Sequence, residues 1–191
     1  MLVTFWKTSV ISVAVSVLLS CLVPAPGGCG TIPQPGDTLP ELRLTAPESS
    51  RDKAYLGIGN AAGFSIADIG SNLLVLEIMG VYCPQCHKQR PHINRLFNRI
   101  STSGSLAVKV KFLGIASGAT PMEAAYYVKQ FKVPYPILID TNYETHKLLG
   151  EPRTPFNMVV NREGKVLFTH LGIIEDMNSF FATLKKLAGE E

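Results

Sequence analysis

Hydrophobic and polar positions change their period several times along the chain. Leu73–Met79 is a nearly continuous apolar run with one charge, Glu77, and such a run is typical of a strand buried on both faces. The residues that follow predict a helix beginning near Pro84, because apolar side chains recur there at spacings of three and four: Ile93, Leu96, Phe97 and Ile100. A buried strand therefore leads directly into a helix in the middle of the chain.

The same periods predict strands at 42–44, 108–115 and 135–140, a turn or single helical turn at 64–69, helices at 121–131, 142–149 and 177–187, and a hairpin of strands 156–161 and 166–171. Strand-like and helix-like segments alternate, so we expect one α/β domain with a central sheet flanked by helices.

Two groups of side chains have a structural interpretation only. Four basic residues of the helix near Pro84 fall off its apolar stripe, and we expect them to form a solvated face: Lys88, Arg90, Arg95 and Arg99. The aromatic pairs Tyr126-Tyr127 and Phe180-Phe181 are predicted to pack in the core and its grooves.

Composition narrows the class of protein. The 191 residues are 46% hydrophobic and 17% charged, which suits one packed domain with a short extension and excludes a disordered chain. The net charge of +3 arises from 18 basic and 15 acidic residues, with no basic block that could neutralise a run of phosphates. Nucleic acid is therefore not an expected partner.

The N-terminus indicates export. Residues 8–19 form an uncharged apolar run behind Lys7, which is shorter than the roughly 20 residues of a membrane span. The sequence Leu18-Leu19-Ser20-Cys21 resembles a bacterial lipoprotein box, which implies lipidation of Cys21; an uncleaved signal anchor that continues through Val23 is the alternative. Both interpretations place the protein in the bacterial periplasm, anchored to a membrane.

This N-terminus also suggests the domain boundaries. We expect a signal peptide or signal anchor at 1–20, a Pro/Gly-rich tether at 21–38 and the folded domain at 39–191. Cys29 lies in the tether, where it is interpreted as an incidental thiol.

Cys83 and Cys86 form a C-x-x-C at the junction of the predicted strand and helix. Unpaired N–H groups and the dipole at a helix N-terminus stabilise a thiolate, so Cys83 is the candidate nucleophile and Cys86 the resolving thiol. Pro84 suits the first helical position. A structural zinc site would need a second ligand pair, which the four histidines do not supply, so no metal is expected.

Four further features around this motif make the chain resemble the thioredoxin superfamily. Glu77 stands six residues before Cys83, Tyr82 takes the place of the usual tryptophan, Pro91 follows Cys86 by five residues, and Thr154-Pro155 precedes a predicted strand. From about residue 36 onward the chain is similar to exported TlpA-type disulfide reductases and to the wider redoxin group, which includes the alkyl hydroperoxide reductase branch. The resemblance implies a thioredoxin-like fold with a mixed sheet.

The resemblance also implies roles and partners. Glu77, costly in an apolar strand unless neutral or partnered, would take the proton of Cys86. Tyr82, Thr154 and Pro155, the last in a cis bond, would form the substrate-binding surface. Expected partners are protein thiols and disulfides, among them apocytochrome c, and a membrane reductant such as a transmembrane thiol relay. The redox-active disulfide Cys83–Cys86 would be the only redox group, with its redox direction left open.

Two competing functions remain. The C-x-x-C-H formed by Cys83, Cys86 and His87 also matches the attachment motif of haem c, and a bound haem would make the protein an electron carrier. We nevertheless expect His87 to be an exposed helix residue. A thiol peroxidase of the redoxin group should carry a threonine where this chain has Gly80. One TlpA feature is also missing, because Gln89 stands where some of those reductases have a functional glutamate.

Overall fold

The computed structural model describes residues 30–190. The predicted signal segment, Cys21 and Cys29 lie outside the described residues, so their interpretations stay predictions. Within the described part of the chain, every helix is too short or too polar to cross a bilayer.

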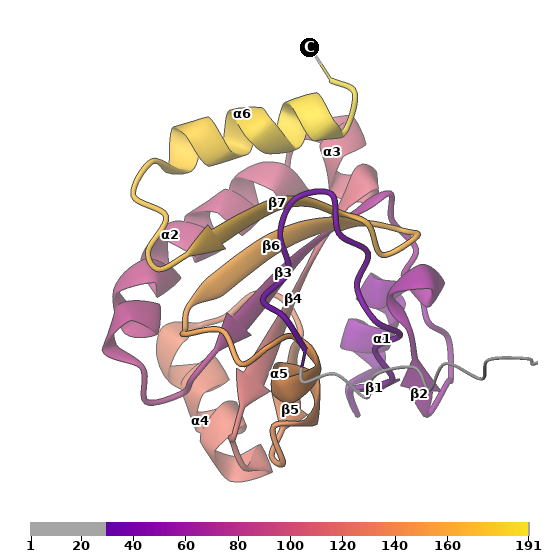
Figure 1. Ribbon diagram of the computed structural model, residues 1–191. Coiled ribbons are helices and arrows are strands. Elements are labelled where there is room, and N and C mark those ends of the chain that lie inside the picture. The colour runs from indigo at the N-terminus through magenta and orange to yellow at the C-terminus, as the bar shows by residue number, and fades with distance from the viewer. Residues whose placement is uncertain (1–29, 191) are drawn as a thin grey trace, which may run out of the picture.

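A five-stranded sheet forms the centre of the protein (Figure 1), in the order β5-β4-β3-β6-β7. β3 (Leu73–Met79) pairs in parallel with β4 (Val110–Ser117), which pairs in parallel with β5 (Ile137–Asp140). On the other side, β3 pairs antiparallel with β6 (Phe156–Asn161), and β6 with β7 (Val166–Leu171). The predicted mixed sheet is therefore confirmed, and β3, whose residues are all buried, is its central strand.

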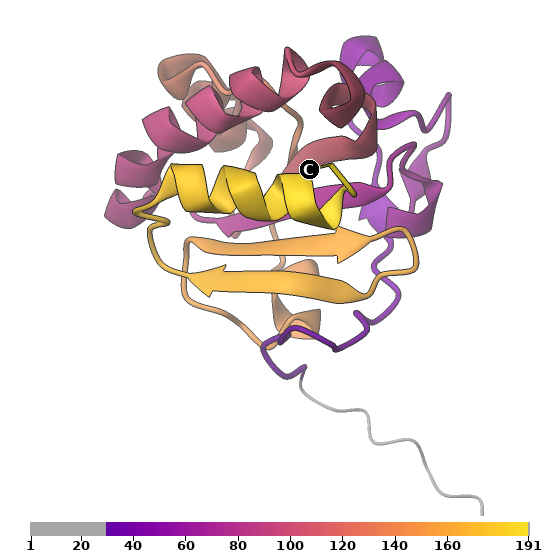
Figure 2. The ribbon, with the colours of Figure 1, turned by 90° about the horizontal axis from the view of Figure 1, so that it is seen from above.

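Helices connect the parallel strands and cover the sheet. α2 (Pro84–Ser101) joins β3 to β4, and α4 (Pro121–Phe131) joins β4 to β5. α6 (Met177–Leu187) lies beside α2 on one face of the sheet (Figure 2), and α5 (Glu144–Leu148) follows β5. The alternation of strand and helix predicted for residues 73–140 is confirmed.

The two faces of β3 are occupied differently. Leu74, Leu76 and Ile78 pack in a core with the N-terminal elements, whereas Leu73 and Val75 pack with α2 and α6. Because side chains alternate along a strand, Glu77 lies on the same face as Leu73 and Val75 and points toward α2. This alternation places the only acid of the strand beside the helix that carries the cysteines.

The N-terminal elements differ from the predicted ones. The strand expected at 42–44 is β1 (Leu44–Thr45), which pairs with β2 (Gly63–Phe64), and the expected turn contains a short 3-10 helix, η1 (Ile66–Asp68). The sequence did not predict α1 (Ser50–Leu56), because Leu56 is its one buried residue and apolar periodicity is lacking. Its ends are instead held locally by the Ser49 cap, which accepts a hydrogen bond from Asp52 N–H, and by Gly57 at φ 76°.

A second helix replaces the beginning of a predicted strand. Residues 104–109 form α3 (Gly104–Lys109), and β4 begins at Val110 rather than at 108. Leu106 of α3 is buried in the same core as Ile100 of α2, and this tertiary packing overrides the strand-like alternation of the sequence.

The tether expected at 21–38 is partly packed onto the domain. Gly36 N–H donates to Val166 O at 2.9 Å, and Val166 N–H donates to Asp37 O at 2.8 Å. Gly30 abuts the backbone of Leu148 and Gly150. Backbone hydrogen bonds, which a composition of Pro and Gly does not reveal, therefore attach residues just before the predicted boundary at 39 to β7.

Candidate active site

The C-x-x-C lies where β3 ends and α2 begins. Cys83 is the N-cap of α2, and its N–H donates to Gly80 O at 3.1 Å, which closes the turn between strand and helix. Pro84 occupies the first turn, where its missing N–H costs nothing, and Pro91 lies inside the same helix. Both thiols are free; Cys83 is half-buried and Cys86 is 0% exposed.

The surroundings of Cys83 favour its thiolate. Burial alone would raise the pKa of Cys83, but hydrogen bonds from the Cys86 thiol and the Thr154 hydroxyl outweigh this effect and lower it. Backbone N–H groups at the start of the helix contribute in the same direction, and that of Cys86 lies 3.3 Å from Cys83 Sγ. Cys83 therefore has the properties of an attacking sulfur.

Cys86 has the opposite character. It packs among Met79, Ala116, Ala124 and Tyr127. Burial, assisted by the hydrogen bond to Cys83 and by the negative charges of Cys83 and Glu77, raises the pKa of Cys86 to about 12. The two sulfurs thus differ in ionisation, so Cys86 needs a proton acceptor before it can act as a nucleophile.

Glu77 has buried polar partners on both of its carboxylate oxygens. Its Oε2 lies 2.8 Å from Arg90 Nη2 in an ion pair whose side chains are 0% (Arg90) and 2% (Glu77) exposed. The same oxygen accepts a hydrogen bond from the Tyr135 hydroxyl at 2.9 Å. Within residues 30–190, Oε1 accepts one from the Gln89 amide alone, at 3.3 Å. An anion buried in this way requires such partners.

The prediction that Arg90 belongs to a solvated face is wrong. Arg90 Nε donates to the Tyr127 hydroxyl at 3.0 Å, and Nη1 donates to the Tyr135 hydroxyl. Burial would lower the pKa of Arg90, but Glu77 and the two tyrosines raise it well above its usual value. The other three basic residues of the group, Lys88, Arg95 and Arg99, are exposed as predicted. A buried acid calls for a cation, and that signal could have found Arg90.

Gln89, noted only as a departure from a TlpA feature, joins three parts of the fold. Its amide nitrogen donates to Glu77 on β3 and, at 3.4 Å, to Asn157 Oδ1 on β6. Its oxygen accepts the N–H of Ile174, at 2.9 Å, from the segment before α6. Gln89 and Asn157 are both fully buried, so a neutral amide pair completes the surroundings of Glu77.

The exposed rim of the site consists of Tyr82 and the loop before β6. Tyr82 is 74% exposed, and its hydroxyl donates to Glu123 Oε1 at 2.6 Å. The Thr154–Pro155 bond is cis, and the Cys83 thiol donates to Thr154 O at 3.3 Å. The structure thus brings the three predicted substrate-binding residues around Cys83. Gly80 lies against Cys83 Cβ and Thr154 Oγ1 and itself has no hydroxyl to offer to a peroxide.

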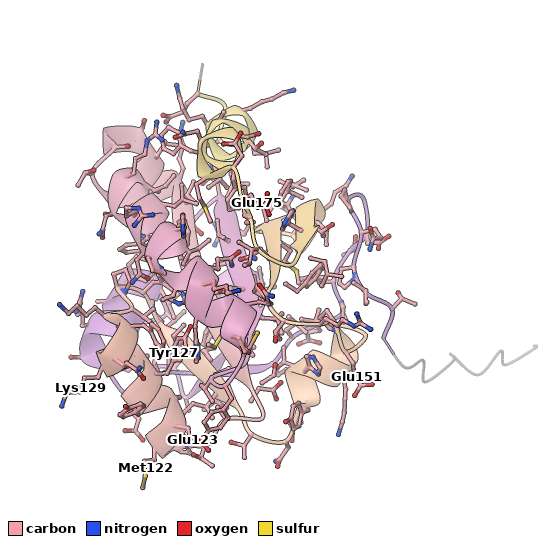
Figure 3. The ribbon with its side chains drawn as sticks, turned by 90° about the vertical axis from the view of Figure 1, so that its left-hand side faces the viewer. Met122, Glu123, Tyr127, Lys129, Glu151 and Glu175 are labelled. Carbon is pink, nitrogen blue, oxygen red and sulfur yellow. The ribbon has the colours of Figure 1, made fainter. Side chains whose placement is uncertain are left out.

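A groove of about 340 Å³ continues from this rim over α4. Its walls are largely aromatic and aliphatic: Val81, Tyr82, His87, Met122, Tyr126 and Tyr127. Figure 3 shows Met122 at the N-terminal end of α4, with its side chain directed away from the protein. Tyr127 lies on the side of α4 that faces α2. Tyr127 is buried as predicted, whereas Tyr126 is 66% exposed, so the prediction of core packing holds for one residue of this pair.

Haem c does not fit this arrangement. His87 is half-buried, contrary to the exposed position expected, because its ring packs on Phe131 with centroids 4.8 Å apart. Its Nε2 lies 2.7 Å from Val81 O, so it is not free to serve as an axial ligand. Cys86 Sγ is enclosed in the core and has no access to a porphyrin edge. Among residues 30–190, no three His, Cys, Asp or Glu side chains gather to hold a metal ion.

Comparison with known proteins agrees with this geometry. The Redoxin family matches residues 34–184 of the chain. The chain belongs to the Redoxin family. Its curated relatives include the thiol-disulfide oxidoreductase ResA of Bacillus thuringiensis subsp. konkukian, 24% identical over 53% of this chain and 56% of the relative. ResA of Halalkalibacterium halodurans is 24% identical over 58% of this chain and 61% of the relative, so the matches span little more than half of these proteins.

Solved structures of other proteins show the fold. The thioredoxin domain of a thiol-disulfide oxidoreductase from Bacteroides vulgatus superposes with a TM-score of 0.59 at 14% identity, covering 81% of this chain and 98% of that one. StoA from Bacillus subtilis gives 0.53 at 18% identity over 66% and 92% of the two chains. The fold of this Redoxin family member is therefore thioredoxin-like, as the sequence implied.

Proposed function

We propose that this member of the Redoxin family is a thiol-disulfide oxidoreductase that acts through Cys83 and Cys86. The main support is the pairing of a half-buried sulfur with a lowered pKa and a buried sulfur with a raised one, at one helix N-terminus. The names of the ResA relatives agree with this activity.

In the reducing direction, the Cys83 thiolate attacks one sulfur of a protein disulfide. The substrate S–S bond breaks, the other sulfur leaves with the electron pair and takes a proton, and a mixed disulfide remains on Cys83. Cys86 then gives its proton to Glu77 and attacks Cys83 Sγ, which releases the second substrate sulfur as a thiolate. The substrate gains two electrons and the protein gains a Cys83–Cys86 disulfide; oxidation of a dithiol is the reverse sequence.

The rim of the site supplies the docking surface for such a substrate. Thr154 and Pro155 lie beside Cys83, where an extended peptide can run along the loop before β6, and the exposed ring of Tyr82, which precedes Cys83 in the chain, offers an aromatic face. No prosthetic group takes part; the electrons reside in the Cys83–Cys86 pair.

The cellular role follows from the N-terminal sequence and the family resemblance. The protein is anchored in the bacterial periplasm, through a lipid on Cys21 or through an uncleaved anchor, with the Pro/Gly-rich segment predicted at 21–38 as the tether. Its substrates are disulfides of proteins such as apocytochrome c, which it reduces before haem attachment, and a transmembrane thiol relay supplies the two electrons that regenerate the Cys83/Cys86 dithiol. Normal maturation of c-type cytochromes in cells that lack the protein, under all growth conditions tested, would contradict this role.

An insulin-reduction assay tests the activity itself. We expect the protein exported to the periplasm to show two reversible thiols, no visible haem band and turnover that Cys83→Ser abolishes. A Soret band with no titratable thiols would instead support the electron carrier. Full retention of turnover in Cys83→Ser would contradict the proposed nucleophile.

A further inference from the structure

We infer that Arg90 is a positioning residue for the resolving step: it keeps Glu77 ionised and turned so that the carboxylate can receive the proton of Cys86. This inference rests on the proposed function. It concerns a side chain that touches neither cysteine and that sequence patterning assigned to the solvent.

The first argument is the position of the pair. Glu77 and Arg90 are 2% and 0% exposed in their side chains, so water does not stabilise either charge. A carboxylate in such surroundings without a cation holds a proton at neutral pH and cannot accept another. Arg90, at 2.8 Å, is the one cation in contact with Glu77 among the described residues, so the ionised state of the acid depends on it.

The second argument is that the two carboxylate oxygens of Glu77 have different hydrogen-bond partners. Oε2 is engaged by Arg90 and by the Tyr135 hydroxyl, whereas Oε1 accepts only the longer bond from Gln89. Oε1 therefore retains room for a proton. As Cys86 Sγ attacks Cys83 Sγ, the S–H bond of Cys86 breaks and the proton passes to Oε1, while the electron pair of the broken Cys83–substrate bond leaves with the substrate sulfur.

The third argument is that Arg90 is itself held in place from several elements. Tyr127 of α4 accepts from Nε at 3.0 Å and belongs to the same buried cluster as Cys86. Tyr135, ahead of β5, contacts both Arg90 and Glu77. Glu77 is thus in contact with Arg90 and Gln89 of α2 and with Tyr135, and its strand partner on β6 is the uncharged Asn157. Its charge also acts on Cys86 of α2 and on Tyr127 of α4.

The reaction of the reduced protein with Ellman's reagent separates the two steps. In a Cys21→Ser/Cys29→Ser background, which removes the two thiols outside the site, the first thionitrobenzoate release reports attack by Cys83 and the second reports resolution by Cys86. Both can be followed by stopped-flow absorbance from pH 6 to 10. We expect Glu77→Gln to slow the second phase by roughly 100-fold, the lower range for loss of a general base. Arg90→Met should slow it at pH 7 and recover toward wild type as the pH rises and Glu77 ionises.

Three variants complete the test. Arg90→Lys restores a cation and should resolve nearly as fast as wild type, and Arg95→Met, on the exposed face of the same helix, should change neither phase. The double variant Glu77→Gln/Arg90→Met removes both buried charges and should resolve no more slowly than Glu77→Gln. It keeps the test valid if Arg90→Met alone does not fold.

The outcomes separate the two proposals. Loss of the first phase in the wild-type protein would overturn the thiol-disulfide function. Resolution by Arg90→Met at the wild-type rate at pH 7, or slowing by one constant factor at every pH, would overturn the role of Arg90 alone. A double variant slower than Glu77→Gln would also count against it, because Arg90 would then act independently of Glu77.

Discussion

The two cysteines lie one helical turn apart but belong to different environments. Around Cys83 are the exposed Tyr82 and the loop with Thr154 and Pro155. Around Cys86 are buried side chains carried by strands and helices, with the ion pair of Glu77 and Arg90 nearby. We call the first environment the rim and the second the buried cluster. The difference teaches that, under the proposed function, exposed loops would contact the substrate, whereas side chains fixed by strands and helices would transfer the proton.

Substitution of each cysteine should have the largest effect on activity and should distinguish the rim from the buried cluster. Cys83→Ser should reduce turnover of a protein disulfide to the uncatalysed rate, because no attacking sulfur remains. Cys86→Ser should still attack and should accumulate as a mixed disulfide with the substrate, detectable by mass spectrometry under non-reducing conditions. An adduct that accumulates on Cys86 in Cys83→Ser, with none on Cys83 in Cys86→Ser, would reverse the assignment of rim and cluster.

The next largest effect should be the loss of folding stability when the ion pair of Glu77 and Arg90 is broken. Removing one partner leaves an uncompensated buried charge, so Glu77→Gln or Arg90→Met alone should lower the free energy of unfolding by roughly 3–5 kcal/mol. The double variant should be more stable than the sum of the single losses predicts, because no charge remains buried. Chemical denaturation of the four proteins in a double-mutant cycle measures this, and simple additivity would show that the pair is not coupled.

The raised pKa of Cys86 predicts a stability that depends on pH and on redox state. In the reduced protein the unfolded thiol loses its proton near its ordinary pKa, whereas the folded thiol keeps it until about 12. Stability is therefore fully present below the ordinary pKa and declines as the pH rises from about 9 toward 12, with a slope approaching ~1.4 kcal/mol per pH unit. Urea denaturation from pH 8 to 10.5 measures the slope, and the oxidised protein should lack this contribution.

The smallest effect should come from the rim. Tyr82→Phe removes the hydrogen bond to Glu123 but keeps the ring, so the denaturation midpoint should not move and KM for a protein substrate should rise less than about tenfold. Tyr82→Ala should raise KM further without changing kcat. A fall in kcat at unchanged KM would place Tyr82 in the chemistry and not in docking.

Segments with a strong period were predictable to the residue. The observed bounds of α4, α6, β6 and β7 are those predicted, because each segment has a continuous apolar face or a turn signal that limits it. α1 and α3 were not predictable from periodicity, since each has only one buried residue and depends on caps or on contacts with distant elements.

The candidate site likewise contains residues that the sequence could predict and residues that it could not. The residues around the thiols came from spacing and resemblance, and the structure brings Cys83, Cys86, Glu77, Tyr82, Thr154 and Pro155 into one region. Spacing and resemblance did not reveal the buried partners of Glu77, because a hydrophobic pattern cannot show which polar face of α2 turns toward the sheet. These partners are Arg90, Gln89, Tyr135 and Asn157. A buried acid indicates that a partner is needed, but the register between β3 and α2, which selects the partner, is a tertiary property.

The hydrogen bonds that residues 36–39 make with the turn between β6 and β7 and with the first residue of β7 have a consequence for association. β7 is an edge strand of the sheet, and a strand of another chain could otherwise pair with its free backbone groups. Gly36, Asp37 and Leu39 engage Val166 and Gly164 there. Deleting this short stretch should therefore leave the dithiol intact yet promote self-association through the uncovered edge.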